Sequence, residues 1–156
     1  PTLRLSVSAY IPEDYVADSH QRLSLYKRLS SCGQLGDLAL MHGEIEDRYG
    51  HPPDPVERLF ELMQIRLLAK QLRLSSVVEQ PHAVVITFDP KATVSETAVQ
   101  SLMDRYKKRL RFLSPLSFEL QIPHEDWSLV FPELNATLQT LHVCGTNNQG
   151  PRTAST

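Results

Sequence analysis

The sequence predicts an α+β fold in which a small, mostly antiparallel sheet packs with about five helices. Three observations lead to this prediction. Several segments repeat apolar residues at steps of three and four, the helical period. Others alternate apolar with polar residues or are rich in β-branched residues, as strands are. The expected order is strand, three helices, hairpin, helix, strand, helix, which lacks the regular alternation of a parallel, doubly wound sheet.

The chain opens on a predicted strand over residues 3–9, where apolar and polar residues alternate. A proline turn ends this strand, and Asp18 or Ser19 then caps a first helix that ends at Gly33. Its expected apolar stripe consists of Leu23, Tyr26 and Leu29. Because the chain begins inside a strand, without an initiator Met or a leader, we expect it to be part of a longer protein.

Two more helices follow. The second should end at Gly50, since glycine readily adopts the left-handed backbone of a helix end. Its apolar stripe is Leu38, Met41, Ile45 and Tyr49. The third has the clearest start, with Asp54 as N-cap, Pro55 at the first helical position and Glu57 able to complete a capping box. It should run to about Leu72, and its broadly spread apolar residues indicate a central packing element.

The second half of the chain supplies most of the predicted sheet. Two short strands, at 77–78 and 83–88, are joined by a turn. A helix starts near Ser95, a half-buried strand covers 116–122, and a last helix covers 127–141.

Composition limits what this chain can be. Residues 1–144 should form one domain and residues 145–156 a disordered polar tail rich in Gly, Pro, Thr and Asn. With 156 residues and a formal net charge of -2, the chain can bury a core but lacks the positive field of a stand-alone nucleic-acid binder. Cys32 and Cys144 are too few for a disulfide framework. No run of apolar residues suits a membrane span or signal peptide, so we expect a cytoplasmic protein without membrane contact.

The motifs of common enzymes are missing from the sequence. Neither GxxxxGK[ST] nor GxGxxG occurs, so we expect this chain to bind no ATP and no other cofactor. His42, Glu46 and His51 are loosely metal-like, but zinc needs three or four convergent ligands, and a helix surface is favoured. The run 18–20 contains the residue types of a catalytic triad, yet sequence neighbours rarely have triad geometry. The sequence therefore predicts a domain that is not itself an enzyme.

A basic segment, residues 105–111, is the remaining candidate site. Its cations are Arg105, Lys107, Lys108, Arg109 and Arg111. On one helix face they could neutralise DNA phosphates or dock on an acidic protein surface. Alternatively, they form a solvated face that complements the negative end of the helix dipole. We favour the solvated face and keep an accessory DNA-binding module as the alternative.

Two stretches resemble a known family. The first comprises YIPEDYV at 10–16, Asp18, RL at 22–23 and YKRL at 26–29. The second comprises EIEDRYGHPPDPV at 44–56, followed by Leu59. Together they resemble the signatures of the C-terminal domain of bacterial transcription-repair coupling factor, and the similarity covers most of residues 3–122.

The resemblance implies a large parent protein, an ATP-dependent DNA translocase that displaces stalled RNA polymerase and recruits UvrA for nucleotide-excision repair. Its motor, which uses ATP and Mg, would lie outside this chain. In that family the C-terminal domain docks in cis on the N-terminal UvrA-binding region and holds an autoinhibited state. The resemblance therefore implies a non-catalytic regulatory domain whose parent contacts RNA polymerase, UvrA and DNA.

Five charged residues in the signatures are not readily explained by packing. They are Arg22, Lys27, Arg28, Asp47 and Arg48. They could form salt bridges that fix the helices to one another, or a charged surface used for interdomain docking. Exposure of these side chains would favour docking, and burial would favour a structural role.

Overall fold

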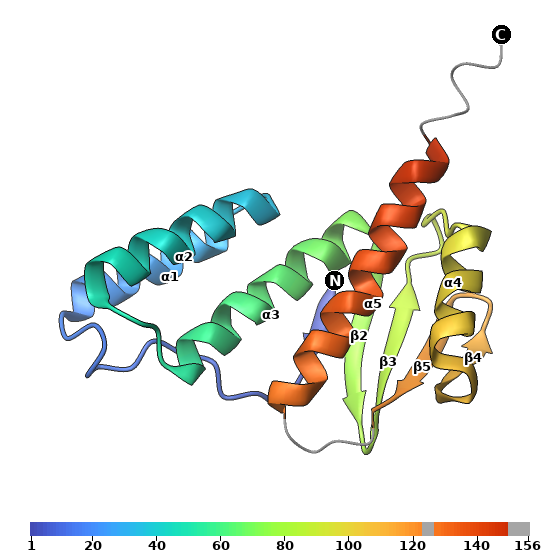
Figure 1. Ribbon diagram of the computed structural model, residues 1–156, viewed down its shortest axis with the longest axis horizontal. Coiled ribbons are helices and arrows are strands. Elements are labelled where there is room, and N and C mark those ends of the chain that lie inside the picture. The colour runs from blue at the N-terminus through green and yellow to red at the C-terminus, as the bar shows by residue number, and fades with distance from the viewer. Residues whose placement is uncertain (123–126, 150–156) are drawn as a thin grey trace, which may run out of the picture. The chain divides into compact units, whose positions relative to one another are not determined.

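The computed structural model describes the backbone of residues 1–122 and 127–149 and the side chains of residues 1–122 and 130–142. Within these residues it contains five α-helices, one short 3-10 helix and five strands (Figure 1). The elements are β1 (Thr2–Arg4), α1 (Ser19–Ser31), α2 (Leu35–Tyr49), α3 (Asp54–Gln71), β2 (Leu74–Gln80), β3 (Ala83–Phe88), α4 (Glu96–Tyr106), η1 (Lys107–Arg109), β4 (Leu110–Ser114), β5 (Ser117–Gln121) and α5 (Trp127–Gln149). The predicted α+β class is confirmed.

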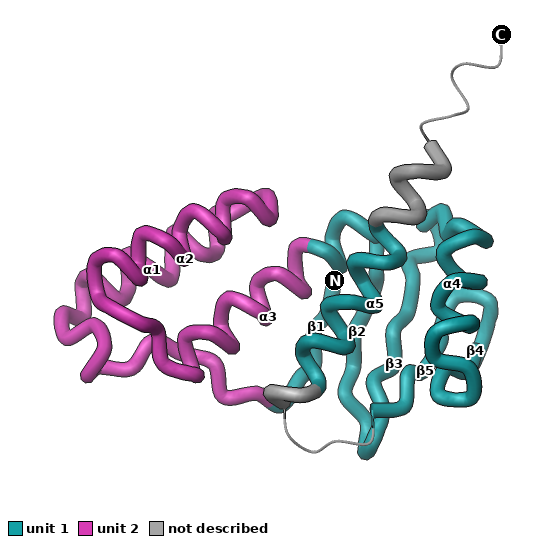
Figure 2. Tube along the Cα trace, in the orientation of Figure 1, with its two compact units in different colours: residues 1–6, 68–156 teal, residues 7–67 magenta. Residues whose placement is uncertain are grey.

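The chain divides into two compact units. Unit 1 comprises residues 1–6 and 68–156, and unit 2 comprises residues 7–67 (Figure 2). The predicted split into a domain over 1–144 and a tail over 145–156 stays a prediction. Helix α5 extends through Gln149, and residues 150–156 lie outside the described residues.

Unit 1 is built on a five-stranded sheet of order β1-β2-β3-β5-β4. Only the β1–β2 pair is parallel, so the expected, mostly antiparallel character is confirmed. Strand β3 lies at the centre, and its register pairs Ile86 with Val77 on one side and with Phe118 on the other. Helices α4 and α5 lie side by side over one face of the sheet (Figure 1). The alternating apolar residues of the strands are buried beneath them.

Unit 2 is a helical unit formed by α1, α2 and the first part of α3. Its core includes Leu25 and Leu29 of α1, Met41 and Ile45 of α2, and Phe60 of α3. The prediction that Leu23 belongs to the apolar stripe of α1 is wrong, since Leu23 is 53% exposed. Leu25 faces the core in place of Leu23, and the predicted burial of Leu29, four residues further on, is confirmed.

Several of the predicted element boundaries change in the structure: β2 spans Leu74–Gln80 and not 77–78, and α5 extends beyond residue 141 to Gln149. Strand pairing of β1 ends at Arg4, although alternating partial burial continues to Ala9. The carbonyl of Pro53 accepts the backbone N–H groups of Val56 and Glu57 at 3.0 and 3.1 Å, so α3 is capped one residue earlier than predicted. The predicted helix after Ser95 ends at Tyr106, and a separate strand, β4, follows it.

Candidate docking surface

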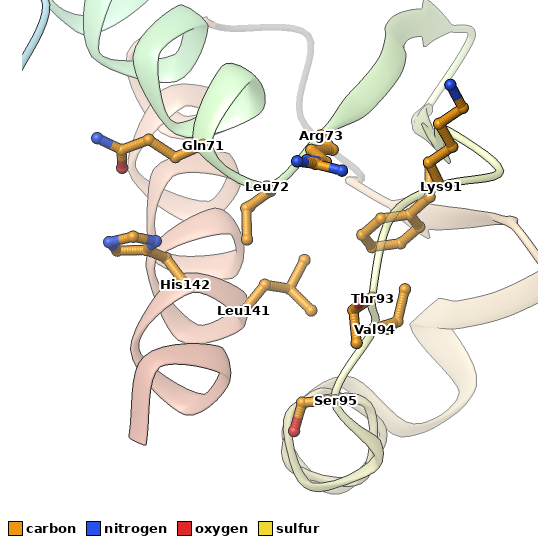
Figure 3. A pocket seen from close by; sticks show the side chains of 10 residues that line it. Gln71, Leu72, Arg73, Lys91, Thr93, Val94, Ser95, Leu141 and His142 are labelled. Atoms are coloured by element: carbon orange, nitrogen blue, oxygen red, sulfur yellow. The ribbon is translucent and has the colours of Figure 1, made fainter. Parts of the chain in front are cut away.

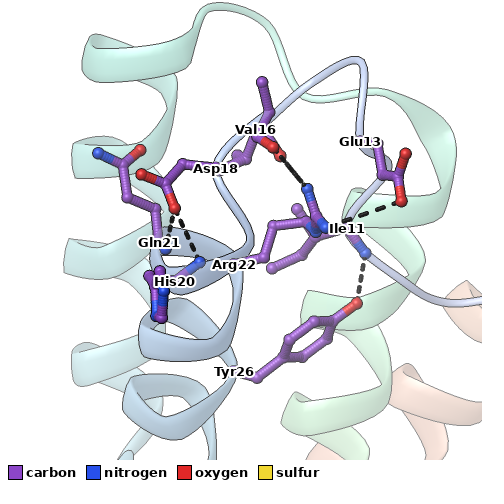
Figure 4. Close-up of polar contacts among 9 residues, drawn as sticks. Ile11, Glu13, Val16, Asp18, His20, Gln21, Arg22 and Tyr26 are labelled. Carbon is purple, nitrogen blue, oxygen red and sulfur yellow. Dashed lines mark hydrogen bonds and ion pairs between the residues drawn. The ribbon is translucent and has the colours of Figure 1, made fainter.

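Two tyrosines of the family-like stretches, Tyr15 and Tyr26, connect the loop over residues 10–18 to the rest of unit 2 by hydrogen bonds. The Tyr26 hydroxyl accepts the backbone N–H of Ile11 at 2.7 Å (Figure 4). The Tyr15 hydroxyl donates to the carbonyl of Gly50 at 2.7 Å. Burial, with smaller contributions from nearby Glu46 and other groups, raises the pKa of Tyr15, so this hydroxyl keeps its proton. These two tyrosines therefore have a structural role, holding the loop in place.

Arg22 serves the same loop. Its guanidinium donates to the carbonyls of Val16 and Ala17 at 2.8 and 3.0 Å and lies 3.8 Å from Glu13 (Figure 4). Its side chain is only 18% exposed, whereas that of Glu13 is 87% exposed. Asp18 caps α1 beside it by accepting the backbone N–H of His20 at 2.8 Å. This arrangement favours a structural role for Arg22.

The remaining charged signature residues lie on the pair of helices α1 and α2. Arg28 of α1 and Glu44 of α2 form an ion pair of 2.6 Å, with side chains 47% and 60% exposed. Residues three and four apart share one helix face, so Asp47 and Arg48 lie on the same face of α2 as Glu44. We call Lys27, Arg28, Asp47 and Arg48 the α1–α2 charged face.

Three members of this face are exposed and lack a partner of opposite charge. Lys27, Asp47 and Arg48 are all exposed. Within the described part of the chain, none of the three takes part in an ion pair. Arg48 lies over the ring of Tyr49, 5.3 Å from its centroid. An exposed ion pair contributes little to stability, so these charges are available for contacts with another surface.

Sequence reasoning missed Glu44 as the partner of Arg28 in this surface. Its pairing with Arg28 links positions 16 residues apart across two helices. The spacing of Glu44 from Asp47 and Arg48 was the only local signal, and it is common on solvated helices. The link therefore appears only once α1 and α2 are placed side by side.

Of the loosely metal-like residues, His42 and Glu46 lie near each other and Glu57 joins them, whereas no contact brings His51 to this group among the described residues. His42 Nε2 lies 2.9 and 3.1 Å from the two carboxylate oxygens of Glu57, and His42 Nδ1 lies 3.8 Å from Glu46. The Glu57 carboxylate therefore contacts the His42 ring, and among the described residues it does not form the predicted capping box. No group of three or more His, Cys, Asp or Glu in the described residues is arranged to hold a metal ion.

The basic segment is not one helix face, which corrects the sequence expectation. Arg105 ends α4, Lys107 to Arg109 form η1, and Arg111 lies on β4. The cause is a break at Lys107, whose φ of 51° leaves the helical region. The five cations consequently point from three different backbone elements.

Two of these cations are already neutralised. Arg109 pairs with Glu133 of α5 at 2.7 Å and donates to the carbonyl of Gln121 at 3.1 Å. Arg111 pairs with Glu119 on the neighbouring strand at 2.9 Å. Arg105, Lys107 and Lys108 are exposed and form no ion pair among the described residues. The segment therefore offers three accessible charges.

The fold is that of a small α+β domain, and its helix pair α1–α2 carries exposed charged side chains. The chain belongs to the TRCF domain family, whose profile matches residues 5–99. No helix in the described part of the chain has the length and apolar character that a bilayer crossing requires.

Relatives and a solved structure agree with this assignment. The transcription-repair-coupling factor of Myxococcus xanthus is 32% identical over 123 residues, which cover 79% of this chain and 10% of that protein. That of Haemophilus influenzae is 30% identical over 117 residues, covering 75% of this chain and 10% of the relative. A crystal structure of the C-terminal domain of a transcription-repair coupling factor matches with a TM-score of 0.83 at 15% identity, over 94% of both chains. The last match shows the fold, and the chain spans about a tenth of the length of these two relatives.

Proposed function

We propose that this chain is a non-catalytic regulatory domain of a transcription-repair coupling factor. In this proposal it docks in cis on the UvrA-binding region of its parent protein, in the cytoplasm, and holds an autoinhibited state. The parent would be an ATP-dependent DNA translocase that contacts RNA polymerase, UvrA and DNA. Family membership supports the identity of the parent, and the α1–α2 charged face supports docking.

One observation carries the docking proposal: the charged residues of the family-like stretches differ in their contacts. Arg22 is held against backbone carbonyls, whereas Lys27, Asp47 and Arg48 are exposed. A charged residue whose role is purely structural should make internal contacts like those of Arg22. Charges left in solvent fit an interface that forms and opens again.

An interface of this kind suits a reversible switch. Interdomain surfaces that must separate are of modest area and fairly polar, since a large apolar interface would not release. A closed state favoured about 100-fold over the open state needs only about 2.7 kcal/mol. A few charged hydrogen bonds, worth about 1.5–3 kcal/mol each, supply free energy of that size. Engagement of polymerase would then shift the population toward the open state.

Deletion of residues 1–156 from the full-length parent tests this function. The deletion should tighten binding to UvrA and raise DNA-dependent ATP hydrolysis, because the masked region and the motor are both released. Titration calorimetry measures the first effect and a coupled ATPase assay the second. If UvrA affinity and ATPase both stay at the wild-type level, the regulatory role is wrong.

A second candidate, an accessory DNA-binding module, rests on the exposed cations Arg105, Lys107 and Lys108. Three phosphate contacts would give a slope of log affinity against log salt no steeper than about -2.7. The isolated chain would then bind duplex DNA weakly and lose that binding when Lys107 and Lys108 are changed to Glu. Absence of measurable binding at low salt removes this candidate.

A further inference from the structure

A pocket in unit 1 is separate from both surfaces described above. It has a volume of about 340 Å³ and is lined by the end of α3, the segment from β3 to the start of α4, and α5. Pockets of about 300–1,000 Å³ are typical of small-molecule sites. In Figure 3, Leu72 and Leu141 lie between His142 and the side of the pocket that carries Arg73 and Lys91, and the Lys91 side chain extends away from these two leucines. The pocket thus combines charged and apolar walls.

The charge of the lining is positive. Arg73 and Lys91 carry permanent positive charges, and none of the lining residues is acidic. Neither residue forms an ion pair with any residue whose side chain the structure describes. The neighbouring carboxylate, Asp89, accepts the backbone N–H of Lys91 at 2.8 Å. Two cations that form no ion pair with the described side chains therefore border the cavity, with the Asp89 carboxylate close to the backbone of Lys91.

The same pocket offers hydroxyl groups and the start of a helix. Thr93 and Ser95 line it, and Ser95 is the N-cap of α4, accepting the N–H of Ala98 at 3.3 Å. The first-turn N–H groups of a helix and the positive end of its dipole favour an anion. The start of α4 lies across the pocket from Arg73 and Lys91 (Figure 3), and Glu96 in its first turn offsets part of the positive end of the helix dipole.

Arg73 is held in an unusual backbone conformation. It follows α3 with a φ of 55°, a left-handed region that helix ends normally fill with glycine or asparagine. Its carbonyl accepts the N–H of Asp89 at 2.9 Å, which connects the helix end to the segment that carries Lys91. An arginine at such a position costs more than glycine, which is consistent with a use for its side chain.

The deeper lining is apolar. Leu72, Phe88, Val94 and Leu141 contribute to it, and Phe88 is only 4% exposed. An inorganic anion would leave this apolar surface in contact with water. A ligand with an apolar or aromatic body would cover it and gain about 25 cal/mol per Å² of buried area.

We propose that this pocket binds a phosphate monoester with an aromatic or apolar organic part, such as a nucleoside monophosphate. The phosphate carries close to two negative charges, which match Arg73 and Lys91, and its terminal oxygens accept from several donors at once. The organic part lies against Leu72 and Leu141. The site is independent of the docking function proposed above.

The test uses the full chain and three probes: adenosine monophosphate, adenosine and inorganic phosphate. Titration calorimetry and amide chemical-shift mapping should show saturable binding of the monophosphate, with shifts at residues 71–73 and 91–95. Adenosine and phosphate should each bind at least 10-fold more weakly, because each makes only part of the contacts. No saturable binding of the monophosphate, or equal binding of inorganic phosphate, would overturn the proposal.

Two variants and a matched control locate the site. Arg73→Asn removes the guanidinium and tolerates the positive φ, and Lys91→Gln removes a charge from an exposed position. Each should weaken the monophosphate about 10-fold or more, the value of one charged hydrogen bond. Lys108→Gln, an equal charge change away from the pocket, should leave affinity unchanged. Equal loss in Lys91→Gln and Lys108→Gln would show non-specific attraction and refute the site, even if Arg73→Asn fails to fold.

Discussion

Substitution of Tyr26 by Phe removes one oxygen atom and tests how the signature residues act in the fold. The Tyr26 hydroxyl is the acceptor for the backbone N–H of Ile11, at 2.7 Å, and Ile11 is 5% exposed. Without it, a buried donor loses its partner while the aromatic ring stays packed against the core of unit 2. A buried donor without a partner costs about 1–3 kcal/mol. The free energy of unfolding should fall by that amount.

Urea unfolding of the chain, followed by circular dichroism, measures this loss. With a urea dependence of about 2 kcal/mol per molar, the midpoint should move down by about 0.5–1.5 M. Tyr10→Phe is the matched control, because Tyr10 is 47% exposed and should change stability by less than about 0.5 kcal/mol. If Tyr26→Phe is as stable as the control, the assignment of the signature tyrosines to the fold is wrong.

Three further predictions concern Arg22, Phe118 and Glu61. Arg22→Ala should destabilise the chain by about 1–3 kcal/mol because two carbonyls lose their donor, while Arg48→Ala should stay within about 0.5 kcal/mol; an equal loss in both would contradict the division between them. Phe118→Ala should cost about 3–5 kcal/mol in chemical denaturation, since Phe118 is 1% exposed at the centre of unit 1, and a loss below 1 kcal/mol would place it outside the core. Burial, then the charge of Glu57, raises the pKa of Glu61. Its stabilising contribution is therefore complete below the unfolded pKa of about 4.3 and lost as pH rises through the folded pKa. Glu61→Gln should raise the melting temperature at pH 7 and change it little at pH 4, and the opposite pH dependence would refute the shift.

Local chemistry was predictable from the sequence. Of the two predicted caps of α1, Asp18 is the one that accepts N–H groups of the first turn, and α4 begins where Ser95 predicts, although the predicted cap of α3 at Asp54 is wrong. Gly50 ends α2 with a φ of 91°, a value that a glycine allows and other residues disfavour. These features depend on a few consecutive residues, so sequence alone can identify them.

Features that depend on distant partners were missed. The helical spacing predicts that Leu110 and Arg111 continue the preceding helix, whereas pairing with β5 makes them the start of strand β4. Leu23 was placed in the core because its spacing to Tyr26 fits a helix stripe, but the position of α2 and α3 decides which stripe is buried. The pocket bordered by Arg73 and Lys91 combines three separate segments and has no local signature.

The same limit applies to the candidate docking residues. Their charge and their place in the two family-like stretches single out Arg22, Lys27, Arg28, Asp47 and Arg48. Composition could not separate a guanidinium held by two carbonyls from one in solvent. That separation required the path of the loop over residues 10–18, which brings the Val16 and Ala17 carbonyls to Arg22.

UvrA affinity of the full-length parent carrying the double variant Asp47→Lys, Arg48→Glu tests the docking surface most directly. The variant keeps the net charge and reverses the pattern at two exposed positions, so stability of the domain should stay within about 0.5 kcal/mol. UvrA binding should become at least 10-fold tighter, as expected when about 1.4 kcal/mol of interdomain contact is lost. Lys108→Glu, in unit 1, should leave it unchanged. Wild-type UvrA affinity in the double variant, or an equal gain in Lys108→Glu, would contradict docking through the α1–α2 charged face.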